Sequence, residues 1–248
     1  MVRIKTLQEI KLMRKLGKIN SLIIKKLVRY ARPGISAKDL EVQANILMEK
    51  FNVKPAFLGY KGFPSSLCIS LNEELIHGVP SSGKIFKKGD LVSIDLGLYD
   101  GSFYSDCAYS FSIGRPLSLA KDLLRVGEAA LKKAIAIIKP KIKIGDIGYT
   151  IQSFVERAGF CVVKKFVGHG VGKQLHEEPE VPNFGKPSEG LELKEGMTLA
   201  IEPMLTLESP DVEILEDGWT VVSKDRNLCV HFEHTIAVTK KGCWVLTA

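Results

Sequence analysis

The feature that most constrains this chain is a predicted β-hairpin with an acid in each strand. Residues 88–106 alternate in the β-rich manner of strands, and Asp100-Gly101 near their centre is a strong two-residue turn signal. If only these two residues form the turn, Asp95 lies directly opposite Asp106, with Cβ atoms about 5 Å apart. Two buried carboxylates so placed repel each other and are costly if left unpaired. No Lys or Arg lies between the two acids, so the pattern predicts a metal ion.

The same pattern recurs later in the chain. The segment around Asp95 reappears around Glu202, 107 positions further on, and Glu233 takes the place of Asp106 at a longer offset of 127. A single acid in an apolar strand is usually an edge-strand charge or a satisfied core group. Two acids from each half instead predict one central site built from four carboxylates.

Helical patterns repeat at the same offset. Each half reads as two helices followed by strands that end in a hairpin, over about residues 6–115 and 118–240. We therefore expect an α+β fold in which residues 1–248 form a single catalytic domain. In this fold, two helices plus antiparallel strands are repeated about a pseudo-two-fold axis. The 45% apolar content is sufficient for a sizeable core.

Caps and prolines mark the helix boundaries. Thr6 and Glu9 form a capping box at the start of a helix that we expect to run to about Ala31. Further helices are expected from Ser36 to about Phe51, from Ser118 to near Lys139, and from Gly145 to Ala158.

The first helix has two distinct faces. Its apolar spacing predicts a buried stripe made of Leu12, Leu16, Ile19, Ile23 and Leu27. A separate basic face carries Lys11, Lys15, Lys18, Lys25 and Arg29. The net charge of +7 is concentrated here, because residues 1–50 hold twelve Lys or Arg against four Asp or Glu.

Cysteine usage and hydropathy exclude several classes of protein. The five cysteines are odd in number and show no Cys-x-x-Cys spacing, which predicts buried free thiols in a reducing cytoplasm rather than disulfides or a zinc site. No apolar run approaches the length of a membrane span, and residues 1–6 lack the apolar core of a signal peptide.

The glycine-rich stretch from Gly168 to Pro179 is not a nucleotide-binding motif. Its Gly-Lys is followed by Gln174, and Lys173 stands where a dinucleotide fingerprint needs its third glycine. The glycines instead allow the backbone to crowd close to His169. The spacing of seven residues between His169 and His176 does not by itself indicate a zinc site.

Two other hydrolase classes can be weighed against the metal site. No Gly-x-Ser-x-Gly elbow is present, so a serine hydrolase has no visible nucleophile. A cysteine hydrolase centred on Cys68 with His77 is an alternative, but it leaves the four acids unexplained.

Taken together, the motifs resemble one family. Asp95, Asp106, His169, Glu202 and Glu233 reproduce the order and approximate spacing of the ligands in the pita-bread metallopeptidases. The motifs Gly-His169-Gly-Val-Gly, Ile-Glu202-Pro-Met and Phe-Glu233-His-Thr-Ile are similar specifically to those of type I methionine aminopeptidases, and the resemblance covers nearly the whole chain.

The resemblance implies a pita-bread fold around a dinuclear metal site. Asp95 would chelate one ion, His169 and Glu202 the other, and Asp106 and Glu233 would bridge both. Carboxylates and an imidazole form a hard site suited to Mn, Fe(II) or Co. Two such ions activate water and polarise the scissile carbonyl of a peptide.

The resemblance also implies roles around the metals. Glu202 would shuttle a proton, and His77 and His176 would contact the substrate peptide and the oxyanion. The apolar pocket for the methionine side chain would be formed by Tyr60, Phe63, Cys68, Leu175 and Trp219, and His77 and His176 would complete the substrate-binding residues. Phe57 and Leu175 depart from the bacterial pattern, since a smaller residue and an aromatic residue can occur there.

The expected function is removal of the N-terminal methionine from nascent proteins and peptides with a small second residue. The alternatives are an Xaa-Pro-type pita-bread peptidase and a non-catalytic binding module. We expect a cytoplasmic monomer with no membrane association. For the basic face of the first helix, a solvated surface is the simpler interpretation, and docking to the ribosome is the functional one.

Overall fold

The computed structural model describes residues 2–248. Within this range the helices form two pairs. They are α1 (Leu7–Tyr30), α2 (Ala37–Lys50), α3 (Ser118–Ala136) and α4 (Ile144–Arg157), with a 3₁₀ turn η1 at Tyr60–Gly62. The predicted capping box of α1 is present, because Glu9 N donates to Thr6 Oγ1 and Thr6 N donates to Glu9 Oε2. The helix boundaries agree with expectation, except that α3 ends earlier, at Ala136.

The strands pair antiparallel throughout, as expected. The two longest, β4 (Leu91–Tyr99) and β5 (Tyr104–Ser112), form the hairpin. The others are β1 (Lys54–Pro55), β2 (Cys68–Leu71), β3 (Glu74–Ile76), β6 (Cys161–Val162), β7 (Gly168–Gly170), β8 (Glu177–Val181), β9 (Thr198–Ile201), β10 (Met204–Thr206), β11 (Val212–Ile214), β12 (Val221–Ser223), β13 (Cys229–His231), β14 (His234–Val238) and β15 (Cys243–Val245).

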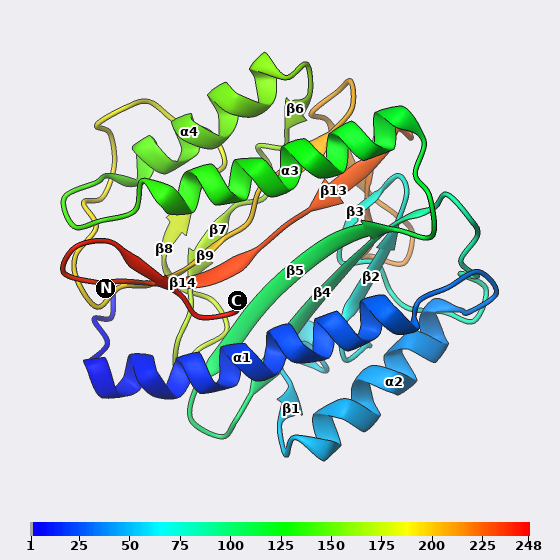
Figure 1. Cartoon of the computed structure of the whole chain (residues 1–248), viewed down its shortest axis with the longest axis horizontal. Coiled ribbons are helices and arrows are strands. Elements are labelled where there is room, and N and C mark those ends of the chain that lie inside the picture. The colour runs from blue at the N-terminus through cyan, green and yellow to red at the C-terminus, as the bar shows by residue number, and fades with distance from the viewer. Residues whose placement is uncertain (1) are drawn as a thin grey trace.

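Each helix pair packs on its own strands. In Figure 1, α1 and α2 lie along one side of the strands, and α3 and α4 lie along the other. Residues such as Leu16 and Leu40 of the first pair share a core with Ile94 of β4. Residues such as Leu123 and Ile151 of the second pair share a separate core with β9, β10 and β14. The sequence offset of 107 separates the start of α2 from that of α4 and the start of β4 from that of β9, while the pseudo-two-fold repeat itself stays a prediction.

Strands β5 and β14 join the two halves. Asp106 N donates to Thr235 Oγ1 at 3.2 Å, and that hydroxyl donates to Asp106 O at 2.7 Å. Glu233 N donates to Ala108 O at 2.9 Å. Two acids that lie far apart in the sequence are therefore brought side by side by these backbone contacts.

The predicted register of the hairpin is wrong by two residues. Asp95 pairs with Ala108, and Asp106 pairs with Gly97, because the turn spans residues 100–103 rather than two residues. Asp100 Oδ1 accepts hydrogen bonds from Ser102 N and Phe103 N, both at 2.8 Å, and the Phe103 side chain is buried in a small core with Ile10 of α1. Since side chains alternate with a period of two, a shift of two residues keeps Asp95 and Asp106 on one face as diagonal neighbours.

One residue of the predicted α1 stripe is misplaced. Leu12 is 39% exposed, whereas Leu16, Ile23 and Leu27 are buried and Ile19 is half-buried. The start of α1 instead buries Ile10 and Met13 against Phe103 and Val171. The helix therefore turns a different face inward where it crosses the hairpin turn. All five residues of the predicted basic face are exposed.

The cysteines of the described chain form no disulfide. Cys68, Cys107 and Cys229 are buried as expected, but Cys161 and Cys243 are half-buried. Among residues 2–248, no helix is both long and apolar enough to cross a membrane.

Candidate active site

A cavity of about 200 Å³ lies between the two halves and collects every predicted site residue. Its lining includes Tyr60, Phe63, Cys68, His77, Asp95, Asp106, His169, Leu175, His176, Glu202, Trp219 and Glu233. One end of the cavity is acidic and the other is apolar and aromatic. Such a concave site with few convergent polar groups is typical of an active site.

Three strands and two connecting segments supply the acidic end. Asp95 comes from β4, Asp106 from β5 and His169 from β7. Glu202 follows β9, and Glu233 lies between β13 and β14. Asn183 Nδ2 donates to Glu202 O at 2.9 Å and so holds the backbone of Glu202 in place. Asp106, His169, Glu202 and Glu233 are all less than 10% exposed.

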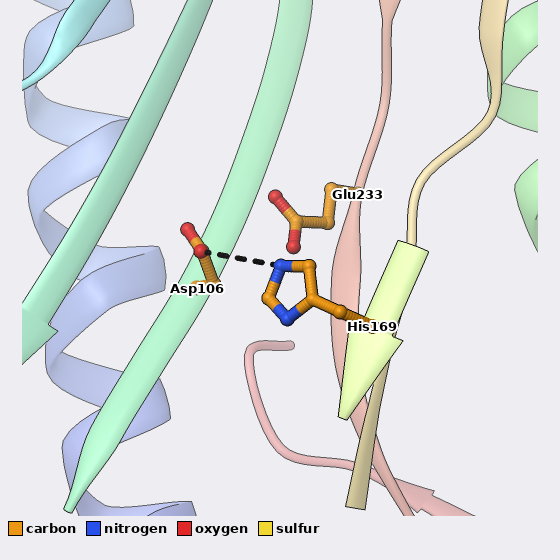
Figure 2. A group of neighbouring side chains, drawn as sticks. All are labelled: Asp106, His169 and Glu233. Carbon is orange, nitrogen blue, oxygen red and sulfur yellow. Dashed lines mark ion pairs between the residues drawn. The ribbon is translucent and has the colours of Figure 1, made fainter. Parts of the chain in front are cut away.

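The ligand atoms of these residues converge. Figure 2 shows Asp106, His169 and Glu233 pointing toward one another, and one ligand atom from each lies within 4.8 Å of the others. His169 Nε2 is 3.9 Å from Asp106 Oδ2 and 3.6 Å from Glu202 Oε1. Asp95 Oδ1 and Glu233 Oε1 are buried and have no hydrogen-bond donor within residues 2–248. Buried oxygens of this kind need a cation or a proton.

The tautomer of His169 favours a cation at this position. Its Nδ1 lies 2.8 Å from Gly170 O, and because a carbonyl only accepts, Nδ1 carries the proton. Burial lowers the pKa of His169 to about 4, so the ring is neutral at pH 7. The Nε2 lone pair is therefore directed at the carboxylates and is available to a metal.

The acids repel one another. Burial raises the pKa of Asp106 to about 7. Burial first, and neighbouring carboxylates second, raise the pKa values of Asp95, Glu202 and Glu233 well above their ordinary range. A divalent cation at the centre of the cluster would remove this penalty, so the donor set fits the metal expected from the sequence.

The apolar end is built from aromatic contacts. Phe63 and Trp219 meet edge to face with ring centroids 5.2 Å apart. Leu175 and Cys68 complete one buried cluster with Phe57 and Phe63, and Tyr60 and Trp219 pack against it. Cys68 pairs with Asp95 across β2 and β4, which places the apolar pocket directly beside the acidic cluster.

His77 and His176, the two histidines expected to contact the substrate, also line the cavity. His176 Nδ1 lies 2.9 Å from the Tyr60 hydroxyl, and its ring centroid is 4.2 Å from that of His169. Burial lowers the pKa of His176 to about 3 and also lowers the pKa of His77. His77 holds a left-handed backbone with φ of 56°, an uncommon conformation for a residue other than glycine. Both rings are neutral at pH 7.

The cysteine-hydrolase alternative does not fit the burial of Cys68, which is 3% exposed. Burial raises the pKa of the Cys68 thiol well above its ordinary value. A nucleophilic cysteine needs a lowered pKa, because the thiolate is the reactive form. Cys68 therefore serves as an apolar wall of the cavity.

Sequence reasoning missed three residues of the cavity, Lys61, Ile76 and His231, and named Phe57 only as a departure from the bacterial pattern. His231 Nε2 lies 3.3 Å from Glu202 Oε2, and neither ring nitrogen has a hydrogen-bond partner in the described chain. Strand alternation could have indicated it, because His231 lies two positions before Glu233. The others lie in loops or short elements whose position only the tertiary structure determines.

Comparison with known families identifies the class of protein. A model of metallopeptidase family M24 matches residues 11–240, and the chain belongs to this family. The pita-bread fold expected from the sequence is confirmed by its structural neighbours.

Individual relatives show which members of the family this chain is similar to. Methionine aminopeptidase 1 of Bacillus subtilis is 43% identical over 100% of this chain and 99% of its own length. Methionine aminopeptidase of Escherichia coli K12 is 38% identical over 99% and 94%. The crystal structure of methionine aminopeptidase from Thermotoga maritima matches with a TM-score of 0.98 and 45% identity, covering 100% and 99% of the two chains. The prolidase of Pyrococcus horikoshii matches with a TM-score of 0.80 and 26% identity, over 99% of this chain and 63% of its own.

Proposed function

We propose that this protein removes the N-terminal methionine from peptides and nascent chains. The observation that carries the proposal is the junction of a buried cluster of carboxylates and imidazole with a closed apolar pocket. The cluster supplies the chemistry of a metallopeptidase, and the pocket supplies room for one uncharged side chain. The full-length identity to proteins named methionine aminopeptidase supports the same function.

Five residues would hold the metals. Asp95, Asp106, His169, Glu202 and Glu233 offer oxygen and neutral imidazole donors, a set suited to Mn, Fe(II) or Co rather than to thiolate zinc. Two such ions, when bound, supply Lewis acidity and an activated water at neutral pH. The converging ligand atoms and the orphaned oxygens of Asp95 and Glu233 support this assignment.

The remaining polar residues orient and protonate the substrate. Glu202 would carry a proton from the nucleophile to the leaving amine. His176, whose Nδ1 lies 2.9 Å from the Tyr60 hydroxyl, would donate a hydrogen bond to the developing oxyanion, and His77 would contact the substrate backbone. Their low pKa values keep both rings neutral, so each acts as a hydrogen-bond donor without adding charge.

The pocket should select methionine by size and polarity. Tyr60, Phe63, Cys68, Leu175 and Trp219 form its walls, with His77 and His176 at its mouth. A thioether packs favourably against aromatic rings. A charged side chain would be desolvated there with no partner, so it should be rejected.

A three-substrate assay tests the function. The metal-loaded protein should cleave Met-Ala-Ser, leave Lys-Ala-Ser intact and lose activity with chelator, and Mn, Co or Fe(II) should restore activity. Preferential cleavage of Arg-Pro-Pro would favour an Xaa-Pro peptidase, which the likeness to the prolidase makes the second candidate. Bound metal without cleavage of any of the three would favour a binding module.

We also propose that the basic face of α1 docks the protein on ribosomal RNA. Lys11, Lys15, Lys18, Lys25 and Arg29 are exposed on one helix and have no ion-pair partner in the described chain. Docked near the exit for nascent chains, a monomeric cytoplasmic enzyme would meet its substrates as they emerge from the ribosome.

Charge reversal tests the docking proposal. Substituting Lys11, Lys15 and Lys18 with Glu should weaken salt-sensitive co-sedimentation with ribosomes and leave cleavage of Met-Ala-Ser intact. Unchanged co-sedimentation would make the basic face an ordinary solvated surface. Sedimentation velocity of the same samples would test the monomeric state.

A further inference from the structure

We propose that a buried ion pair between Lys5 and Glu177 positions His176 in the active site. Lys5 precedes α1, and Glu177 directly follows His176 at the start of β8. The inference rests on the proposed role of His176. It assigns to Lys5 and Glu177 the part of positioning residues that touch no substrate.

The ion pair is unusually well buried for a pair of charges. Lys5 Nζ lies 2.5 Å from Glu177 Oε2, and the two side chains are 1% and 9% exposed. Lys5 N also donates to Gly196 O at 2.8 Å, which fixes the backbone of Lys5 beside the turn before β9. Removal of one buried partner leaves an uncompensated charge, so the pair acts as a unit.

The second oxygen of Glu177 holds the turn that leads to His176. Glu177 Oε1 accepts hydrogen bonds from Lys173 N at 2.6 Å and from Gln174 N at 3.1 Å. A Cβ added to Gly172 would lie 2.5 Å from Lys5 Cε and 2.8 Å from Glu177 Oε1. Only glycine leaves room for this contact, so the ion pair is packed directly against the backbone of the turn.

The turn carries two walls of the active site. Leu175 is 2% exposed in the apolar cluster, and His176 contacts both Tyr60 and His169 by its ring. The Tyr60 hydroxyl contacts the ring of His176, and the Lys5–Glu177 pair holds the backbone of the turn that precedes it. Loosening the pair should therefore shift His176 relative to the cluster that contains His169. A misplacement of about 1 Å can cost about 100-fold in rate.

Two substitutions separate the ion pair from the backbone hydrogen bonds. Lys5→Met keeps the length of the side chain and removes the charge. Glu177→Gln keeps an oxygen that can accept from residues 173 and 174, but its amide donors would face the Lys5 ammonium. Each variant should lower kcat by about tenfold or more, with KM changed less than about twofold. The double variant removes the donor–donor contact and should recover part of the loss.

The matched control is Glu213→Gln. Glu213 forms an ion pair with Arg226 at 2.6 Å, but both side chains are more than 40% exposed. This variant makes the same change of charge and should leave kcat and KM unchanged. Metal content, measured by plasma mass spectrometry, should be equal in all variants, because neither Lys5 nor Glu177 belongs to the acidic cluster.

A cycle with His176→Ala decides whether the pair acts through His176. In that background Lys5→Met should cause no further loss of kcat, whereas a general structural role would cause the same loss in both backgrounds. Equal losses, or a folded Lys5→Met variant with wild-type kcat, would overturn the inference. Wild-type activity of His176→Ala would remove the proposed role of His176 and the inference with it. If Lys5→Met does not fold, Glu177→Gln is judged by the same criteria.

Discussion

At the scale of single residues, the site is organised by buried carboxylates, and Asp95 Oδ1 and Glu233 Oε1 have no hydrogen-bond partner among residues 2–248. Burial raises the pKa of Asp106 to about 7, and burial together with neighbouring carboxylates raises the pKa values of Asp95, Glu202 and Glu233 well above their ordinary range. The imidazole of His169 is neutral, and its Nδ1–H donates a hydrogen bond to Gly170 O. The affinity for divalent ions thus comes at the expense of the stability of the metal-free protein.

Asp106→Asn should weaken metal binding and raise the stability of the metal-free protein. The amide nearly keeps the shape but loses the negative charge, so metal content should fall and activity should drop by about 100-fold or more. In chelator at pH 8 the variant should melt at a higher temperature than the wild type, because it lacks one of the repelling carboxylates. The difference should shrink at pH 6, where Asp106 of the wild type is protonated. A lower melting temperature at pH 8 would show that Asp106 is not destabilised there.

At the scale of elements, the β4–β5 hairpin positions the acids through its close packing. Gly97 pairs with Asp106, and a Cβ at Gly97 would lie 2.9 Å from both Phe57 Cδ1 and Ala56 Cβ. Glycine at this position lets the Phe57 ring lie over the strand and line the cavity. The hairpin therefore fixes the apolar pocket as well as the acidic cluster.

Gly97→Ala should destabilise the protein by about 1–3 kcal/mol, since the added methyl group overpacks the contact with Phe57. Phe57→Leu in the same chain should recover part of this loss. Gly83→Ala is the control, because its added Cβ would meet only Ser81 Oγ at 3.9 Å, and it should change stability by less than about 0.5 kcal/mol. Urea unfolding in the presence of metal measures the wild type, the single variants Gly97→Ala, Phe57→Leu and Gly83→Ala, and the double variant. Additive effects of Gly97→Ala and Phe57→Leu would contradict the contact.

At the scale of the whole molecule, burial of the site makes stability depend on pH. The five histidines have lowered pKa values, so the unfolded chain binds more protons and stability rises with pH up to about 6.5, the ordinary histidine pKa. The four acids have raised pKa values, so the folded chain retains more protons and stability falls as the pH rises through those values. Above about pH 6.5 only the second effect remains.

The metal-free protein should therefore lose stability between about pH 6.5 and 8. Differential scanning calorimetry in chelator should show a melting temperature that falls across this range. Saturating Mn or Co should raise the melting temperature most at pH 8, because the ion binds the deprotonated carboxylates of the folded state only. A metal-free melting temperature that rises from pH 6.5 to 8 would contradict the repulsion among the acids.

The sequence by itself determined the chemistry of this protein and its local structure. Short-range patterns predict the cap of α1, the helix pairs, the antiparallel strands and the motifs that carry the acids. Such patterns depend on neighbouring residues and on the periods of helix and strand. The sequence also placed Asp95 and Asp106 on one face of the hairpin, because an error of two residues in the register leaves each side chain on the same face. The tertiary structure decided what depends on distant contacts. Burial of Phe103 lengthened the turn, and the crossing of α1 over it exposed Leu12.

The same limit applies to the candidate site. The five predicted metal ligands could be named from their motifs. Their convergence, however, requires β5 to lie against β14, and this contact joins residues more than a hundred positions apart. His231 and Phe57 enter the cavity only through that assembly. Lys5 and Glu177 are 172 positions apart, and no local pattern could have paired them. Local interactions are encoded by adjacent residues, whereas a buried ion pair exists only after the core has excluded water around it.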